Sequence, residues 1–262
     1  MTKERLVDEW ISPDEFYREY GQLVFTVDTD LFIPAGGRPE TINNDNWERF
    51  LDENGTPTTR AIVEGANSFL TPLARIELQK RGVVIMRDAS ANKCGVISSS
   101  YEIIANLLLS DKEFMANKDR YVADVIDILE HRAQDEARLI LRRHKEQGAT
   151  MLYTDISDEI SREINTHYAQ LFTFFQKHAH LCGKPLFKKA ILAHLPKMLR
   201  TEERYRRRIK RLPEKYLFAI LASEIASSMV YRENREADFL GVLQSHLQRS
   251  FGDQVERNIN NI

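Results

Sequence analysis

The sequence predicts an α/β fold followed by an all-α part: a portion of a doubly wound parallel sheet and then a helical domain. Three observations support this fold class. Short apolar runs recur in the first hundred residues at spacings of roughly 20–30 residues, which is typical of alternating strands and helices. Seven of the 11 glycines lie before residue 100, and no proline occurs between residues 73 and 184. The later residues instead follow a helical period.

The three apolar runs are Asp30–Ile33, Ala61–Val63 and Val83–Met86, and each ends in a small or polar turn. Continuous runs of this kind are typical of strands that are buried on both faces of a parallel sheet. We therefore predict three parallel strands joined by crossovers. The first strand would be an edge that invites pairing, so a homo-oligomer is one expected assembly.

Helical stretches separate the predicted strands. The first follows Asn43–Asp45 and carries Trp47 and Phe50, and the second begins at Thr71, a capping residue followed by proline, and ends at Gly82. Farther along the chain, apolar residues at steps of three and four predict longer helices. These cover residues 118–147, 155–180, 186–199, 202–232 and 235–250, and we expect Gly183–Pro185, Pro196 and Pro213 to separate the later helices.

Composition limits the class of protein. A chain of 262 residues with 42% hydrophobic residues is long enough to bury a core, and its formal charge of −2 provides no overall basic field for nucleic acid or an anionic membrane. Two distant cysteines, a charged N-terminus and the lack of an 18-residue apolar run favour a soluble cytoplasmic protein. The predicted organisation is an N-terminal segment (1–20), an α/β domain (21–112) and a helical domain (113–262).

The loops after the three strands form the candidate site, because open parallel sheets bind ligands at the carboxyl ends of their strands. These loops are Pro34–Glu40, Glu64–Asn67 and Asp88–Glu102. Each combines small residues, which allow close backbone approach, with amide or hydroxyl groups that can donate to ligand oxygens. The sequence has no G-x-G-x-x-G turn, the usual dinucleotide signature, so the prediction depends on these loops meeting at one edge.

In this order and at these separations, the motifs resemble the large NAD-dependent glutamate dehydrogenases and, more distantly, the glutamate, leucine, phenylalanine and valine dehydrogenase superfamily. The match runs from Asp30–Pro39 through Ile62–Asn67 to Asp88–Glu102. The resemblance implies that residues 21–112 are part of a Rossmann-like NAD-binding domain. It also implies an oxidoreductase that deaminates L-glutamate to 2-oxoglutarate and ammonium, with NAD as the hydride acceptor.

The resemblance assigns roles only to positions that match. Asn67 would lie beside the nicotinamide ribose, and Asn92 near the nicotinamide and the reacting carbon of the substrate. Ser99 matches the serine that binds the side-chain carboxylate of glutamate, which discriminates against apolar amino acids. Lys93 and Cys94 replace small residues of the family pattern; we interpret them as a subgroup feature, although a lysine so near the site could contact an anionic ligand. The implied cofactor-binding residues are Ala35, Gly36, Gly65, Ala66, Asn67 and Asn92, and the implied substrate-binding residues are Ser99 and Asn92.

The catalytic lysine and aspartate of the family and its glycine-rich pyrophosphate turn have no counterpart in this sequence. The chain therefore resembles the C-terminal portion of such an enzyme, either an expressed fragment or the product of a split gene. Its expected partners are the N-terminal part of the same enzyme and the substrate pair L-glutamate and 2-oxoglutarate. Without the lysine that assists proton transfer, the isolated chain should be inactive.

Several patterns have a second interpretation. Asn67, Asn92 and Ser99 are also residue types that cap helices and turns. The segment His178–Cys182 holds two histidines at a spacing of two, which favours a polar helix end over a helical metal site with ligands four apart. No metal is expected.

The segment Arg204–Arg211 holds six basic residues in eight. We favour a solvated helix face, and the alternative is a phosphate-binding face. That alternative supports a rival function: a helical interaction or regulatory module that binds a nucleic acid or an acidic partner. Phe172, Phe174 and Phe175 lie apart from this basic run, so we assign them to the core and not to a base-stacking platform.

Overall fold

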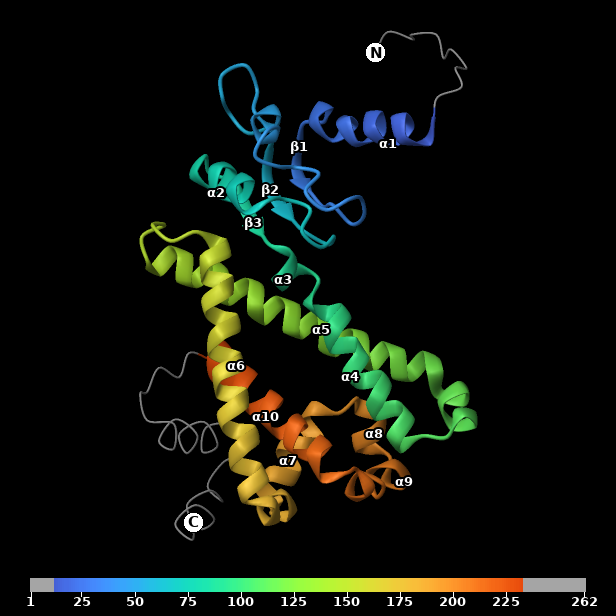
Figure 1. Ribbon diagram of the computed structural model, residues 1–262. Coiled ribbons are helices and arrows are strands. Elements are labelled where there is room, and N and C mark those ends of the chain that lie inside the picture. Colours follow the sequence, from blue (N-terminus) through green and yellow to red (C-terminus); the bar gives the residue numbers. More distant parts are fainter. Residues whose placement is uncertain (1–11, 233–262) are drawn as a thin grey trace. The chain divides into compact units, whose positions relative to one another are not determined.

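The computed structural model describes residues 12–232, which divide into two compact units (Figure 1). The first unit contains the described residues through Asn92 together with Leu152–Thr154, and the second contains Lys93–Met151 and the described residues from Asp155 onward. The predicted fold class is confirmed, because three parallel strands alternate with helical segments in the first unit and only helices follow β3 in the described part of the chain. The predicted domain boundaries stay predictions.

A three-stranded parallel sheet in the order β1–β2–β3 forms the centre of the first unit. Its strands are β1 (Thr29–Phe32), β2 (Thr59–Val63) and β3 (Val84–Met86), each within one residue or two of a predicted run. Leu31 lies opposite Ala61, and Ile62 lies opposite Ile85. Because all three strands run in the same direction, their carboxyl ends share one edge of the sheet.

The prediction that all three strands are buried on both faces is wrong for β1. Leu31 is 47% exposed and Asp30 is exposed as well, whereas Ile62 and Ile85 of the other two strands are buried. The reason is position in the sheet, since β1 pairs only with β2 within the described residues. The apolar run therefore predicted the strand correctly, but not the exposure of its side chains.

Helix α2 begins where the sequence predicts. The Thr71 side chain accepts a hydrogen bond from the amide of Ala74, and proline occupies the first turn. By contrast, the helix predicted after Asn43–Asp45 is only a single 3-10 turn. The side chains of Asn43 and Asn46 bind nearby backbone groups there, which competes with helix hydrogen bonds. The elements of this unit besides the strands are α1 (Pro13–Gln22), η1 (Leu23–Thr26), η2 (Trp47–Phe50), α2 (Pro72–Lys80) and α3 (Asp88–Ala91).

The second unit is helical throughout its described residues. Its longest helix begins with a reciprocal capping box between Ser110 and Glu113. Its elements are α4 (Lys93–Leu108), α5 (Asp111–Glu146), α6 (Tyr153–Lys177, whose first two residues belong to the first unit), η3 (Ala179–Gly183), α7 (Pro185–His194), α8 (Lys197–Thr201), α9 (Glu203–Arg206), η4 (Ile209–Arg211) and α10 (Glu214–Tyr231).

The helix breaks expected at Pro196 and Pro213 are confirmed, since each proline precedes a new helix. The bounds predicted across these prolines are wrong. The range 186–199 is divided into α7 and α8, and the range 202–232 is divided into α9, η4 and α10. The helix predicted over 235–250 lies outside the described residues.

The core of the second unit contains Phe175, with Phe172 and Phe174 packed against it, so the assignment of these rings to the core is confirmed. Cys94 and Cys182 are free thiols. Among residues 12–232, no helix combines the length and the apolar character that crossing a membrane requires.

Candidate functional site

The loops that follow β1 and β2 meet the start of the third predicted loop at the carboxyl edge of the sheet, as predicted. The third segment, Asp88–Glu102, is itself not a loop, because α3 and α4 occupy it, and from Lys93 onward it belongs to the second unit. The amide of Ala66 donates to the carbonyl of Pro34 at 2.7 Å, which joins the second loop to the first. The amide of Ser68 donates to the carboxylate of Asp88 at 2.8 Å, which joins the second loop to the start of the third. Parallel pairing brings the loops together, and these two hydrogen bonds hold them there.

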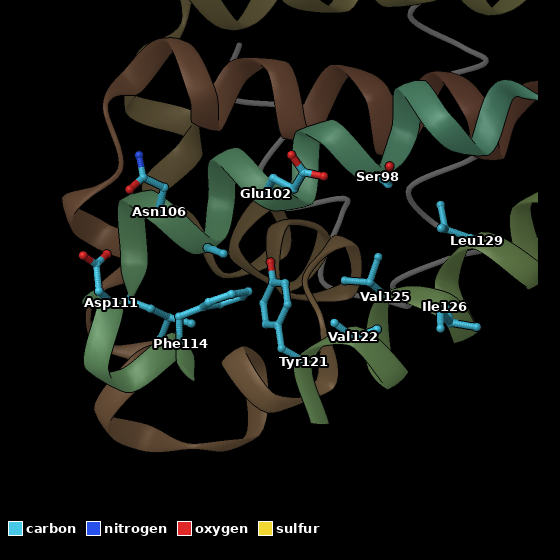
Figure 2. Close-up of a pocket in the computed structure, with 12 residues that line it drawn as sticks. Ser98, Glu102, Asn106, Asp111, Phe114, Tyr121, Val122, Val125, Ile126 and Leu129 are labelled. Atoms are coloured by element: carbon cyan, nitrogen blue, oxygen red, sulfur yellow. The ribbon is translucent and has the colours of Figure 1, made fainter. Parts of the chain in front are cut away.

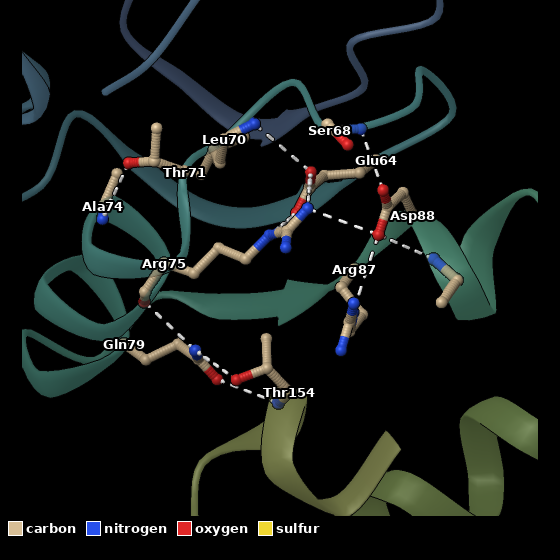
Figure 3. A network of polar contacts seen from close by, with 11 residues as sticks. Glu64, Ser68, Leu70, Thr71, Ala74, Arg75, Gln79, Arg87, Asp88 and Thr154 are labelled. Carbon is tan, nitrogen blue, oxygen red and sulfur yellow. Dashed lines mark hydrogen bonds and ion pairs between the residues drawn. The ribbon is translucent and has the colours of Figure 1, made fainter. Parts of the chain in front are cut away.

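A buried ion network lies directly beneath the loops (Figure 3). Glu64 is fully buried and accepts two hydrogen bonds from the Arg75 guanidinium, at 2.7 and 2.8 Å. Arg75 also lies 3.3 Å from a carboxylate oxygen of Asp88, and the amide of Leu70 points at Glu64 from 3.4 Å. The guanidinium on α2 therefore ties together the ends of β2 and β3.

Sequence reasoning missed Arg75. A signal was present, because Arg75 stands one residue after Ala74 and three before Leu78, both of which lie on the apolar face of the same short helix. A charged residue at such a position needs a buried partner, since an unpaired charge in the core is very costly. Glu64, within the quoted turn, was the available carboxylate.

Asp88 is kept ionised by its surroundings. Burial acts to raise the pKa of its carboxyl, but hydrogen bonds from the amides of Ser68 and Ala89 and the charges of Arg75 and Arg87 outweigh burial, so the pKa lies below its ordinary value. A charged Asp88 holds the second loop through Ser68 and starts α3 through Ala89. Its role in this structure is to position the loops.

The side chains of Asn67 and Asn92 contact each other at the same edge of the sheet. The carboxamide of Asn92 donates to the side-chain oxygen of Asn67, although 25 residues separate them in the chain. Asn67 is exposed and Asn92 half-buried, so the pair reaches the surface. Asn92 also ends α3 through its backbone amide, but its side chain is not used for capping. Two neutral amides are thus presented side by side at the sheet edge.

The small residues of the site differ in how much free space surrounds them. Ala35 and Gly36 are exposed, and a methyl group added at Gly36 would meet no atom within 4 Å. A methyl group at Gly65 would instead lie 3.3 Å from the carbonyl oxygen of Pro34, a close contact that would require a small shift of the first loop. At Gly37, φ is +110° and an added methyl would lie 2.9 Å from the ring of Phe69. Only the surface at Ala35 and Gly36 is open.

Ser99 belongs to the second unit, where it lies on an exposed part of α4. Its hydroxyl is 3.4 Å from the carbonyl of Gly95, one turn earlier, and Ser98 contacts the same carbonyl at 2.9 Å. Lys93, at the start of α4, forms an ion pair with Glu136, which also accepts from the Tyr231 hydroxyl at 2.8 Å. The partner of Lys93 is thus a carboxylate of its own unit.

The helical unit has hollows that the sequence did not predict. One, of about 570 Å³, lies between α4 and α5 (Figure 2). Phe114 and Tyr121 contribute aromatic rings to it, Val125 contributes an aliphatic side chain, and Glu102 and Asp111 are its carboxylates. Such walls suit an apolar group, so this hollow does not resemble a site for acid–base chemistry.

The histidine and arginine motifs also lie in the helical unit. His178 comes directly after α6 and packs on Phe174, with ring centroids 4.7 Å apart. Within the described part of the chain, no three histidine, cysteine, aspartate or glutamate side chains are placed to hold a metal ion. The basic run is not one helix face, because it extends over α9 and η4. Three of its members pair with carboxylates: Arg204 with Glu202, Arg207 with Glu203 and Arg208 with Glu113.

A parallel sheet with small-residue and amide-bearing loops at its carboxyl edge defines the class of α/β proteins that bind ligands at that edge. Residues 2–149 match the profile of the family described as glutamate/leucine/phenylalanine/valine dehydrogenase. The chain belongs to this family.

Curated relatives agree with the family match. The chain is 36% identical over 234 residues to a probable NAD-specific glutamate dehydrogenase of Schizosaccharomyces pombe. The aligned region covers 85% of this chain and 20% of that protein. It is 36% identical to glutamate dehydrogenase 2 of Dictyostelium discoideum (78% of this chain, 20% of that protein) and 32% identical to an NADP(+)-dependent glutamate dehydrogenase of Pyrobaculum calidifontis (53% and 29%). The chain thus spans about one fifth of the length of the first two relatives. No solved structure matches it significantly.

Proposed function

We propose that this chain is the C-terminal portion of an NAD-dependent glutamate dehydrogenase and supplies part of its cofactor and substrate cleft. The reaction is the oxidative deamination of L-glutamate to 2-oxoglutarate and ammonium. The observation that carries the proposal is the Asn67–Asn92 pair at the carboxyl edge of a parallel sheet, in a chain of the dehydrogenase family. The names of the fungal relatives support NAD as the cofactor.

The residues at the edge fit a neutral part of a dinucleotide. Ala35 and Gly36 leave an open surface, and the paired carboxamides of Asn67 and Asn92 offer donors and acceptors without charge. A ribose with its hydroxyls and a nicotinamide with its carboxamide need that kind of contact. When bound, NAD accepts the hydride from the substrate. Asn67 would hold the ribose, and Asn92 would orient the nicotinamide.

Ser99 is proposed to bind the side-chain carboxylate of glutamate. A hydroxyl can leave its weak contact with the Gly95 carbonyl, 3.4 Å away, and donate to a carboxylate, which is a stronger acceptor. Proton transfer then needs a base that this chain does not provide in the proposed motifs. We therefore propose that the lysine and the pyrophosphate turn belong to an N-terminal portion, and that the 262-residue chain alone does not reduce NAD.

The test uses the intact enzyme with two single variants, Ser99→Ala and Asn67→Ala, and steady-state kinetics with each ligand varied. Ser99→Ala removes one hydrogen bond to a charged group, about 1.5–3 kcal/mol, so kcat/KM for glutamate should fall roughly 10-fold to 100-fold while the KM for NAD stays unchanged. Asn67→Ala should act on NAD instead, with kcat lowered by up to about 100-fold through a misplaced nicotinamide.

Ser98→Ala is the matched control, because Ser98 is the neighbouring serine and makes the same contact with the Gly95 carbonyl. Its glutamate kinetics should equal those of the wild type. Circular dichroism establishes that each variant is folded. If Ser99→Ala stays within about twofold of the wild type for glutamate, the assignment of Ser99 is refuted and its hydroxyl serves only the helix.

A further inference from the structure

A second cavity in the helical unit, of about 600 Å³, lies among η3, α7, α9, η4 and the start of α10 (α7, α9 and α10 are labelled in Figure 1). Its floor is aliphatic and aromatic. Ile191, Leu212 and Phe218 are buried beneath it, and Leu192, Ile209 and Leu217 are partly buried around it. None of the loops of the sheet contributes to this cavity.

The rim of the cavity is basic. Lys188, Arg206 and Lys210 line it and are exposed, and within residues 12–232 none of the three forms an ion pair with a carboxylate. Glu214 is the one carboxylate among the lining residues. Arg206 and Lys210 come from the basic run 204–211, in which arginines 204, 207 and 208 form ion pairs and Arg211 is exposed outside the cavity. Three members of the run thus form structural ion pairs, and two line the cavity without a carboxylate partner.

Arg206 and Lys210 lie on different elements because the helix α9 ends before η4 begins. Arg206 ends α9, and Lys210 lies in the separate turn η4. Tyr205 between the paired arginines is fully buried, with the guanidinium of Arg204 4.4 Å from its ring centre, so the short helix is anchored to the core on that side. Arg206, the last residue of this helix, lines the cavity.

The floor carries no charge. Cys182 is the one thiol among the lining residues, and burial, aided by the nearby charge of Glu214, raises the pKa of this thiol to about 11, so the thiol is neutral at physiological pH. An apolar floor favours an apolar body, since each buried methylene strengthens binding about fourfold. Three unpaired cations favour an anionic head, because a charge-assisted hydrogen bond is stronger than a neutral one.

We propose that this cavity binds an amphipathic anion: a small molecule with an aliphatic body on the floor and a phosphate or carboxylate head on Arg206 and Lys210. This site goes beyond the proposed dehydrogenase function, because none of its residues has a role in the cofactor or substrate cleft. A nucleic acid is disfavoured, since such sites need extended phosphate contacts and exposed aromatic platforms, whereas the one phenylalanine of this floor, Phe218, is buried.

The test is isothermal titration calorimetry of the 262-residue chain with monomeric alkyl phosphates. Decyl phosphate should bind roughly 15-fold more tightly than octyl phosphate because of its two additional methylenes, and inorganic phosphate alone should not bind measurably. The double variant Arg206→Gln/Lys210→Gln should weaken decyl phosphate at least about tenfold. Arg211→Gln is the matched control: it removes an exposed cation of the same run that does not line the cavity, and it should leave the affinity within about twofold.

Three outcomes would overturn the proposal. Equal losses for the double variant and for Arg211→Gln would mean that only the diffuse charge of the run attracts anions. Equal affinities for octyl and decyl phosphate would mean that the floor is not used. Binding to vesicles of phosphatidylcholine with phosphatidylserine, without binding to monomeric decyl phosphate, would make the site a membrane contact. Unchanged circular dichroism of each variant completes the comparison.

Discussion

Replacing Arg75 by methionine should strongly destabilise the α/β unit. The guanidinium makes two hydrogen bonds of 2.7 and 2.8 Å with Glu64, and the side chains of Arg75 and Glu64 are 9% and 0% exposed. Methionine keeps most of the volume of the side chain but leaves the carboxylate buried without its counter-charge. Breaking a buried pair in this way costs about 3–5 kcal/mol, far more than an exposed pair.

The assay is urea unfolding followed through the fluorescence of Trp47, which is buried in the same unit, in a Trp10→Phe background so that one indole reports. Lys80→Met is the matched control, because Lys80 lies on the same helix and pairs with Glu77 at 2.9 Å while remaining 59% exposed. Its effect should be within about 0.5 kcal/mol. The double variant Glu64→Leu/Arg75→Met removes both charges and should be more stable than Arg75→Met alone.

The reasoning would be refuted if Arg75→Met cost less than about 1 kcal/mol, or if adding Glu64→Leu to it cost further stability. The first result would mean that water or Asp88 relieves the buried charge. The second would mean that Glu64 is stabilised by the amide of Leu70 and its other surroundings and not mainly by Arg75.

Three further predictions concern single positions, each measured by urea unfolding and circular dichroism. Gly37→Ala should lower the free energy of unfolding by about 1–3 kcal/mol, because φ is +110° and an added methyl group would lie 2.9 Å from the ring of Phe69. The control Gly36→Ala should leave the free energy of unfolding within about 0.5 kcal/mol. Equal effects of the two substitutions would contradict the geometry. The folded pKa of Asp88 lies below its ordinary value of 3.8, so its contribution to stability is full above that pH and is lost as pH falls through the folded pKa. Asp88→Asn should therefore be less stable at neutral pH and lose less stability on acidification; a parallel acid dependence of the two proteins would rule this out. Ser110→Ala removes one half of a capping box and should cost about 0.5–2 kcal/mol, and no loss would show that α5 is held by its packing alone.

Local patterns predicted the elements well where a short stretch of chain was sufficient. The three strands follow from apolar runs, and the start of α2 follows from Thr71 and the proline after it. Pro196 and Pro213 predicted two helix breaks correctly, but helical periodicity on both sides of each proline extended the predicted helix bounds across them. The short turn at Trp47–Phe50 was missed because the asparagines before it bind the local backbone.

The candidate site could be predicted only in part. The residue types of the loops and the parallel order of the strands were enough to expect that Asn67 and the end of β3 would approach each other. The partner of Asn67 was not predictable, since a carboxamide can bind many groups at that distance. Arg75 escaped notice because its role depends on a carboxylate 11 residues earlier that folding brings into contact.

The sequence by itself determined the class of this protein: a parallel α/β sheet, a helical part after it, and the ordered motifs of the dehydrogenase family. These depend on local periodicity and on residue identity, which are independent of long-range contacts. Only the tertiary structure decided that β1 is exposed, that Glu64 and Arg75 form a buried pair beneath the loops, and that three residues of the basic run form ion pairs while Arg206 and Lys210 line a cavity. The physical reason is that burial and ion pairing depend on which distant segments pack together, and no short window of sequence contains both partners.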